Sequence, residues 1–343
     1  MAALAALAII AAIEAGVAML SPRLHTWLDV ATVAKRARLV AREKREEVAI
    51  FGDSRMFSVR PAVVAEALGG NVRAANYAWP FAGIETYDYM LDAYLHYNPP
   101  PRLILVDLMP DYVALNEATM RVATIPEHRI RLFNIVPGVP LAEKLAADRQ
   151  WSLLWGFLTY RFASPTMRYR EPIKDVLLEA IGEGRRSATE PDAGQIAASL
   201  RARGAFVLAP GQVAGPEAIG VLEQKPYGPI GPRPPDILRP FERFLARGRE
   251  NSIRVLLLNP PMPEPLFARY DGLGVLAHFR AQLDRLRQTH ANFEILEPAV
   301  HTLPIEFFSD AGHVNARGDE ALHTSIRERL AEYARRGMAR PGQ

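Results

Sequence analysis

The chain has 343 residues, 49% of them hydrophobic and 23% charged, which is the composition of a folded protein rather than a disordered one. It contains no cysteine, so disulfides, thiol catalysis and cysteine-bound zinc are excluded. The net charge of +3 is small and spread along the chain, so composition does not point to nucleic acid. The length allows one large domain with an insertion, or two modest domains.

Residues 1–20 are nearly all Ala, Leu, Ile and Val, interrupted only by Glu14 and Gly16. This is close to the roughly 20 apolar residues that span a bilayer, and the run predicts a membrane anchor. The alternative is an Ala-rich helix packed on the domain. Residues 21–46 are rich in Lys and Arg interleaved with Glu, and predict a basic linker helix. The positive-inside tendency alone would place this linker in the cytoplasm.

Strand-like and helix-like segments then alternate, which predicts an α/β fold with a parallel sheet covered on both faces. The predicted strands are residues 48–51, 72–77, 103–106, 254–258 and 293–296, and the predicted helices are 57–68, 84–97, 237–249, 276–289 and 316–335. These elements place the main domain at residues 47–110 and 250–335.

Residues 111–249 interrupt this alternation and predict an insertion between the third and fourth strands. Two helices are expected within it, at about 141–149 and 151–162, and a Pro- and Gly-rich stretch follows at about 210–235. The second helix carries the aromatic residues Trp151, Trp155, Phe157 and Tyr160. Core packing is the favoured interpretation of their spacing, with an apolar cap, a membrane-interface surface or a partner site as alternatives.

Three residues suited to nucleophilic catalysis follow predicted strands. Ser54 comes after the first strand, in Gly-Asp-Ser-Arg, whereas Asp310 and His313 share a loop after the fifth. The carboxyl ends of parallel strands meet at one edge of a sheet, so we expect these residues to lie together. Ser54 would be the nucleophile, His313 the general base, and Asp310 the group that orients the base. The alternative for Ser54 is that it merely caps a helix.

The three sequence blocks at residues 49–54, 76–83 and 310–313 resemble the first, second and last blocks of the SGNH/GDSL hydrolase superfamily. The resemblance implies a flavodoxin-like three-layer α/β/α fold with a five-stranded parallel sheet, a Ser54–His313–Asp310 triad and no metal or other cofactor. It also implies an oxyanion hole built from the N–H groups of Ser54 and Gly83 and an asparagine side chain.

The chain departs from the family pattern after the third strand. The family usually has Gly-x-Asn-Asp there, whereas this chain has Asp-Leu-Met-Pro at 107–110. Asn76 is the replacement candidate for the missing amide donor, with bonding to its own backbone as the alternative. Arg55, beside the nucleophile, is a candidate for binding a carboxylate or phosphate of the substrate, although pairing with a neighbouring acid is slightly favoured.

The layout as a whole is similar to envelope-associated SGNH-like proteins of polysaccharide O-acylation. It implies a serine esterase or O-acyltransferase acting on acylated carbohydrate or another ester, with an extracytoplasmic catalytic domain and a membrane-bound acyltransferase as a possible partner. No nucleic acid is expected as a partner. One alternative is a non-catalytic scaffold that binds a glycan or a membrane partner. Another is a basic protein that binds a membrane surface or nucleic acid through residues 35–45.

Overall fold

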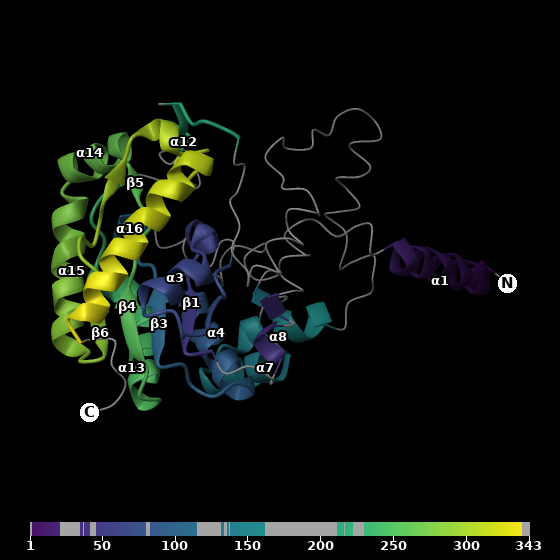
Figure 1. Ribbon diagram of the computed structural model, residues 1–343. Coiled ribbons are helices and arrows are strands. Elements are labelled where there is room, and N and C mark those ends of the chain that lie inside the picture. The colour runs from purple at the N-terminus through teal and green to yellow at the C-terminus, as the bar shows by residue number, and fades with distance from the viewer. Residues whose placement is uncertain are drawn as a thin grey trace.

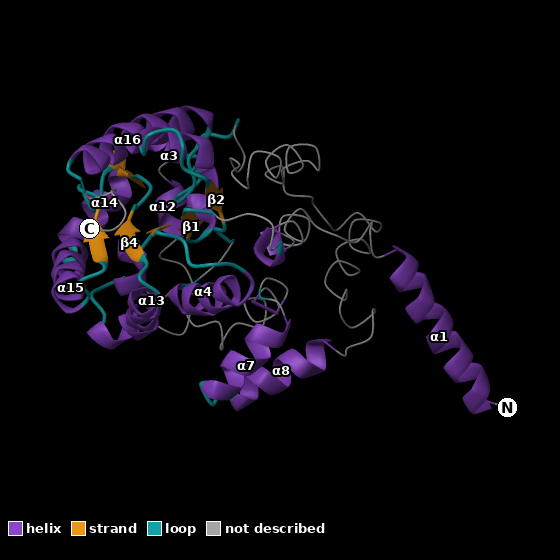
Figure 2. Cartoon of the chain, turned by 60° about the horizontal axis from the view of Figure 1, so that its bottom comes forward, coloured by secondary structure: helices purple, strands orange, loops and turns teal. Residues whose placement is uncertain are grey.

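The described residues of the computed structural model form an α/β structure, shown in Figures 1 and 2. They are residues 2–20, 35–36, 38–41, 46–79, 83–114, 132–133, 136, 138–161, 211–215, 217–221 and 230–337. The predicted basic linker and insertion therefore lie in large part outside the described residues.

Five parallel strands form the central sheet, in the order β2-β1-β3-β4-β6. Their bounds are β1 Val48–Phe51, β2 Ala74–Asn76, β3 Leu103–Val106, β4 Arg254–Leu257 and β6 Phe293–Ile295. Counted along the chain this is the order 2-1-3-4-5, which is the flavodoxin-like arrangement. The predicted α/β fold with a five-stranded parallel sheet is confirmed.

Helices cover both faces of the sheet and complete the three layers (Figure 2). Alternate strand residues point to opposite faces, so Ile50 and Leu105 pack in one core and Phe51 and Val106 in the other. The first core is closed by α3 (Pro61–Ala67) and α16 (Ala316–Arg335). The second is closed by α4 (Ile84–Tyr97), α13 (Arg239–Glu250) and α15 (Val275–Thr289).

The stretch predicted as a single helix over 57–68 contains two elements. A 3-10 helix, η2 (Ser54–Ser58), ends before Pro61, and α3 begins at this proline. Proline lacks the N–H that a continuing helix needs, but it suits a first helical position. The helix therefore cannot run through residue 61.

Further short elements follow the strands. Two 3-10 helices are η3 (Pro110–Val113), which follows β3, and η4 (Pro235–Leu238), which precedes α13. Beyond β4, a second sheet pairs β5 (Met262–Pro263) with β7 (Thr302–Leu303), and α14 (Glu264–Gly272) and η5 (Ile305–Phe307) lie nearby. The sequence did not predict this small sheet or α14.

Of the residues predicted as an insertion, 111–249, α13 packs in the core of the main domain. The other described α-helices there are α7 (Gly138–Ala147), α8 (Trp151–Arg161) and α12 (Glu217–Val221). Phe157 of α8 is buried against Phe133, with 5.4 Å between ring centroids. Trp151 and Trp155 are 61% and 69% exposed, so the core-packing interpretation does not hold for these two residues.

Within the stretch predicted as a membrane anchor, Ala2–Leu20 form α1. Across the described ranges, no helix is long and apolar enough to cross a membrane.

The expected basic linker contains a buried lysine. Lys35 is 1% exposed, its ammonium donates to the carbonyl of Ala78, and it lies 4.5 Å from the ring centroid of Phe57. Burial, with a smaller effect of Arg38, lowers the pKa of Lys35 well below its ordinary value. Arg38 is paired with Glu46 at 3.3 Å. These two basic residues therefore pack on the domain and do not form an open cationic surface.

Candidate active site

A tight turn after β1 presents Ser54. Gly52 has φ of +152°, and a Cβ at this position would lie 2.4 Å from Cγ of Met56 and 2.6 Å from Oδ1 of Asp107. Only glycine fits there. Asp53 caps η2 by accepting a hydrogen bond from the Arg55 N–H at 2.8 Å. Ser54 thus occupies the N-terminal end of a helical turn, where backbone N–H groups lack intrahelical partners.

A closed loop after η5 carries the other two candidates. Phe308 and Val314 form an antiparallel bridge at its neck, and the Ser309 N–H donates to the His313 carbonyl at 2.8 Å. Asn315 then caps α16 by accepting from the N–H groups of Arg317 and Gly318. The loop is therefore short and fixed at both ends.

The structure brings Ser54, His313 and Asp310 into one chain of hydrogen bonds. His313 Nε2 lies 2.7 Å from Ser54 Oγ, and His313 Nδ1 lies 2.7 Å from Asp310 Oδ2. With Asp310 accepting the proton on Nδ1, Nε2 is free to accept the hydroxyl proton. This is the geometry of a nucleophile, a base and an orienting acid.

Several donors hold Asp310 in its ionised form. Burial alone would raise the pKa of Asp310, but hydrogen bonds from the His313 ring and from the Gly312 and His313 N–H groups lower it below its ordinary value. The two backbone bonds measure 2.7 and 2.9 Å to Oδ1. Asp310 therefore carries its negative charge at neutral pH, as stabilisation of an imidazolium requires.

Arg55 is engaged by two acids. Its guanidinium bonds to the carboxylates of Asp53 and Asp111, and its side chain is 12% exposed. The predicted pairing with a neighbouring acid therefore describes its placement, and binding of the substrate by Arg55 stays a prediction.

Asn76 is fully buried and its amide is already used. Its Nδ2 donates to the carbonyl groups of Met56 at 2.8 Å and Val59 at 2.9 Å, and its Oδ1 accepts from the Ala78 N–H. No N–H of this amide remains to bind an oxyanion, so the oxyanion role predicted for Asn76 is corrected to a structural one. It ties η2 to the end of β2.

Gly83 lies directly before α4 as its N-cap residue, with an extended backbone. Residues 80–82 lie outside the described residues. The role of the Gly83 N–H in an oxyanion hole stays a prediction.

A buried polar cluster lies behind the nucleophile turn. Asp107 is fully buried, its Oδ1 accepts from Tyr87 at 2.6 Å, and Tyr112 donates to Asp53 at 3.0 Å. Burial and the neighbouring Asp53 raise the pKa of Asp107 well above its ordinary value. This favours a neutral carboxyl group directly after β3.

Sequence reasoning missed Asp111, Tyr112 and Tyr270 as parts of this cluster. Asp111 and Tyr112 follow β3, so the sheet-edge argument that found Ser54 would also have found them. Tyr270 comes from α14 and donates to Asp111 at 2.6 Å. Nothing in the sequence around Tyr270 indicates this contact.

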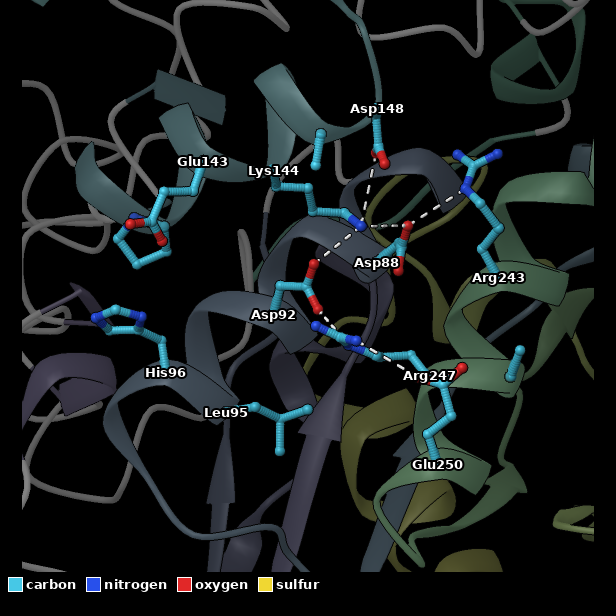
Figure 3. A pocket seen from close by; sticks show the side chains of 13 residues that line it. Asp88, Asp92, Leu95, His96, Glu143, Lys144, Asp148, Arg243, Arg247 and Glu250 are labelled. Carbon is cyan, nitrogen blue, oxygen red and sulfur yellow. Dashed lines mark hydrogen bonds and ion pairs between the residues drawn. The ribbon is translucent and has the colours of Figure 1, made fainter.

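A separate cavity of about 620 Å³ lies between α4, α7 and α13 (Figure 3). Lys144 is at its centre, 3.1 Å from Asp88 and 2.9 Å from Asp92. Arg243 and Arg247 pair with the same two acids from α13. Each Lys and Arg side chain that lines this cavity is therefore paired with acids of the protein, and none of the candidate catalytic residues lines it.

Among the described residues, no group of three or more His, Asp or Glu side chains is placed to hold a metal ion. No family model and no curated protein matches the chain. Among solved structures, the chain is similar to "a putative platelet activating factor" from Streptococcus pneumonia, with 12% identity and a TM-score of 0.37. The match covers 92% of this chain and 98% of that one. A TM-score this low carries no information on activity. The function is therefore inferred from the geometry of the site.

Proposed function

We propose that this protein is an ester-acting enzyme of the SGNH/GDSL type, working through an acyl-Ser54 intermediate. One observation carries the proposal: a single hydrogen-bonded chain joins Ser54 Oγ, both nitrogens of His313 and the Asp310 carboxylate, at 2.7 Å for each link. Serine is a weak nucleophile unless an adjacent base takes its proton.

In the first half-reaction, Ser54 Oγ attacks the acyl carbonyl carbon while His313 Nε2 takes the hydroxyl proton. The tetrahedral intermediate collapses as the bond to the leaving alkoxide breaks, and the imidazolium returns the proton to that oxygen. Asp310 stabilises the imidazolium throughout. The N–H groups of Ser54 and Gly83 are the proposed oxyanion donors.

In the second half-reaction, His313 removes a proton from an acceptor hydroxyl, which attacks the acyl-serine and releases Ser54 with its proton restored. Water as the acceptor gives hydrolysis, and a sugar hydroxyl gives O-acyl transfer. The resemblance noted from sequence favours an acylated cell-envelope carbohydrate as the substrate class. Comparing turnover of acetylated sugars with turnover of a simple acetyl ester tests this choice.

Turnover of a chromogenic acetyl ester by wild type and Ser54→Ala tests the activity. We expect kcat of the variant to fall by about 10⁴-fold or more, since loss of one triad member leaves only the contributions of binding and oxyanion contacts. A fluorophosphonate should label wild type at Ser54, which intact-mass and peptide analysis can locate. Equal turnover by the two proteins would disprove the proposal.

A second candidate, a non-catalytic protein of the same type that binds a glycan or membrane partner, has one observation in its favour. Both N–H groups of the Asn76 amide donate to backbone carbonyls, and residues 107–110 contain no asparagine. Neither place therefore supplies an amide donor for an oxyanion hole. Loss of one oxyanion donor costs about 10²–10³ in rate. This candidate predicts no fluorophosphonate labelling, and glycan binding that survives Ser54→Ala.

A further inference from the structure

The guanidinium of Arg55 joins two parts of the chain that flank the nucleophile. Its Nε lies 3.1 and 3.0 Å from the two carboxylate oxygens of Asp53, and its Nη2 bonds to the same group. On the other side, Nη1 bonds to Asp111 in η3, 56 residues further along the chain. One side chain thus connects the turn after β1 to the turn after β3.

The aliphatic part of Arg55 runs alongside the loop that carries the base. A Cβ placed on Gly312 would lie 3.7 Å from Cδ and 3.9 Å from Cγ of Arg55, which is ordinary van der Waals separation. Gly312 stands between Asp310 and His313, and its N–H donates to Asp310. The Arg55 side chain therefore lies next to Gly312, in the loop that carries both partners of Ser54.

The two acids that hold Arg55 are themselves fixed. Tyr270 donates to Asp111 at 2.6 Å, and Tyr112 donates to Asp53 at 3.0 Å while its ring lies 5.7 Å from the guanidinium carbon. The paired charges of Arg55, Asp53 and Asp111 are largely buried. Moving one of them away from its partner would therefore be costly, because a buried charge without a partner is destabilising.

We propose that Arg55 is a positioning residue that sets the distance between Ser54 and His313 by bridging Asp53 and Asp111 next to the 310–313 loop. This rests on the proposed function, since it concerns the same site. A fork-shaped guanidinium can bond two carboxylates in fixed directions, whereas a lysine ammonium cannot reproduce this geometry. Arg55 then acts through Ser54 and does not bind an anionic part of the substrate.

The test compares Arg55→Lys, Asp111→Asn and Tyr270→Phe with wild type on two esters, one neutral and one bearing a carboxylate. Arg55→Lys should lower kcat about 10–100-fold with KM changed by less than about twofold, because a displacement on the order of 1 Å reduces the rate to this extent. The other two variants should show smaller losses of the same kind. Tyr270→Phe, which keeps its ring, serves as the mildest variant if Arg55→Lys does not fold.

A second measurement does not depend on turnover. The proton between His313 Nδ1 and Asp310 should give a downfield NMR signal in wild type that is weakened or lost in Arg55→Lys. Unchanged kcat and an unchanged signal in folded Arg55→Lys would overturn the proposal. So would a loss confined to KM for the carboxylate-bearing ester. If wild type turns over neither ester, the proposed function fails, and the NMR comparison still decides whether Arg55 positions the loop.

Discussion

At the scale of single residues, Gly52 sets the shape of the nucleophile turn. Its backbone has a positive φ, and the space where a Cβ would stand is filled by Met56 and Asp107. A side chain here would displace either η2, which begins at Ser54, or the buried carboxyl group behind it. The turn is therefore incompatible with any residue larger than glycine.

Gly52→Ala should destabilise the protein by about 3 kcal/mol or more, from backbone strain together with overpacking. Gly69→Ala is the matched control, because Gly69 also has a positive φ of +110° but nothing lies within 4 Å of its would-be Cβ. That variant should lose only about 1–2 kcal/mol from the backbone term. Urea unfolding of both variants measures the difference, and equal losses would show that Met56 and Asp107 move aside at no cost.

At the scale of elements, one residue, Asn315, contacts both α16 and the base loop, which is the loop of residues 309–313 that carries Asp310 and His313. The carbonyl oxygen of the Asn315 side chain caps α16. Its two Nδ2 N–H groups are shared among the carbonyl groups of Glu306 at 2.9 Å and of Gln212 and Phe308 at 3.2 Å. These donations hold the neck of the loop and a segment of the insertion. The same side chain therefore stabilises the start of α16 and the loop that positions His313.

Asn315→Ser should separate these two roles. Serine caps helices about as well as asparagine, so the helix content measured by circular dichroism should be unchanged. The amide donors are lost, so kcat should fall roughly 10-fold as the neck of the loop loosens, with a stability loss of about 1–2 kcal/mol. A variant that loses stability but keeps wild-type kcat would show that the neck does not position His313.

Much of the sheet and of the candidate triad was predictable from the sequence. The strands β1 and β3 are short apolar runs, and Ser54 lies just after the first of them, so parallel pairing places it at the carboxyl edge of the sheet. Asp310 and His313 lie beyond β7 and η5, so their contact with Ser54 also depends on the path of the chain after β6. The helix expected over 316–335 was found with those bounds, because the asparagine before it gives a clear start signal.

What could not be predicted depends on contacts far apart in the chain. Asn76 looked free to face the site, but η2 folds back so that Met56 and Val59 take both its donors. Similarly, Lys35 stands in a charged stretch, and only the packed structure shows that it is buried. Local sequence patterns predict where a strand ends. They do not predict which distant group a polar side chain will bond to.

At the scale of the whole molecule, described residues of the insertion contact the main domain both at the helical layer and beside the loop that carries His313. Lys144 of α7 bonds to the two acids of α4 that line the cavity in Figure 3. The Ala214 N–H donates to the Phe308 carbonyl at 2.8 Å, at the neck of the base loop. The described parts of the insertion therefore contact both the helical layer and the candidate active site.

Stability of the whole fold should depend on pH through His301. Burial, and secondarily Arg329 of α16, lower the pKa of His301 to about 4, whereas an unfolded histidine titrates near 6.5. Between these values the unfolded chain binds more protons than the folded one, so stability is lost as pH falls from about 6.5 toward 4. Its Nδ1 lies 3.5 Å from Nη1 of Arg329, which explains why a second positive charge is disfavoured there.

Thermal or urea unfolding at pH 7 and pH 5 measures this dependence. The His301 contribution to the loss between these two values should be about 1–2 kcal/mol. His301→Asn keeps a hydrogen-bond acceptor but cannot titrate, so it should lose less stability than wild type over the same interval. If the free energy of unfolding falls by the same amount in both proteins between pH 7 and pH 5, titration of His301 does not contribute to the acid sensitivity of the fold.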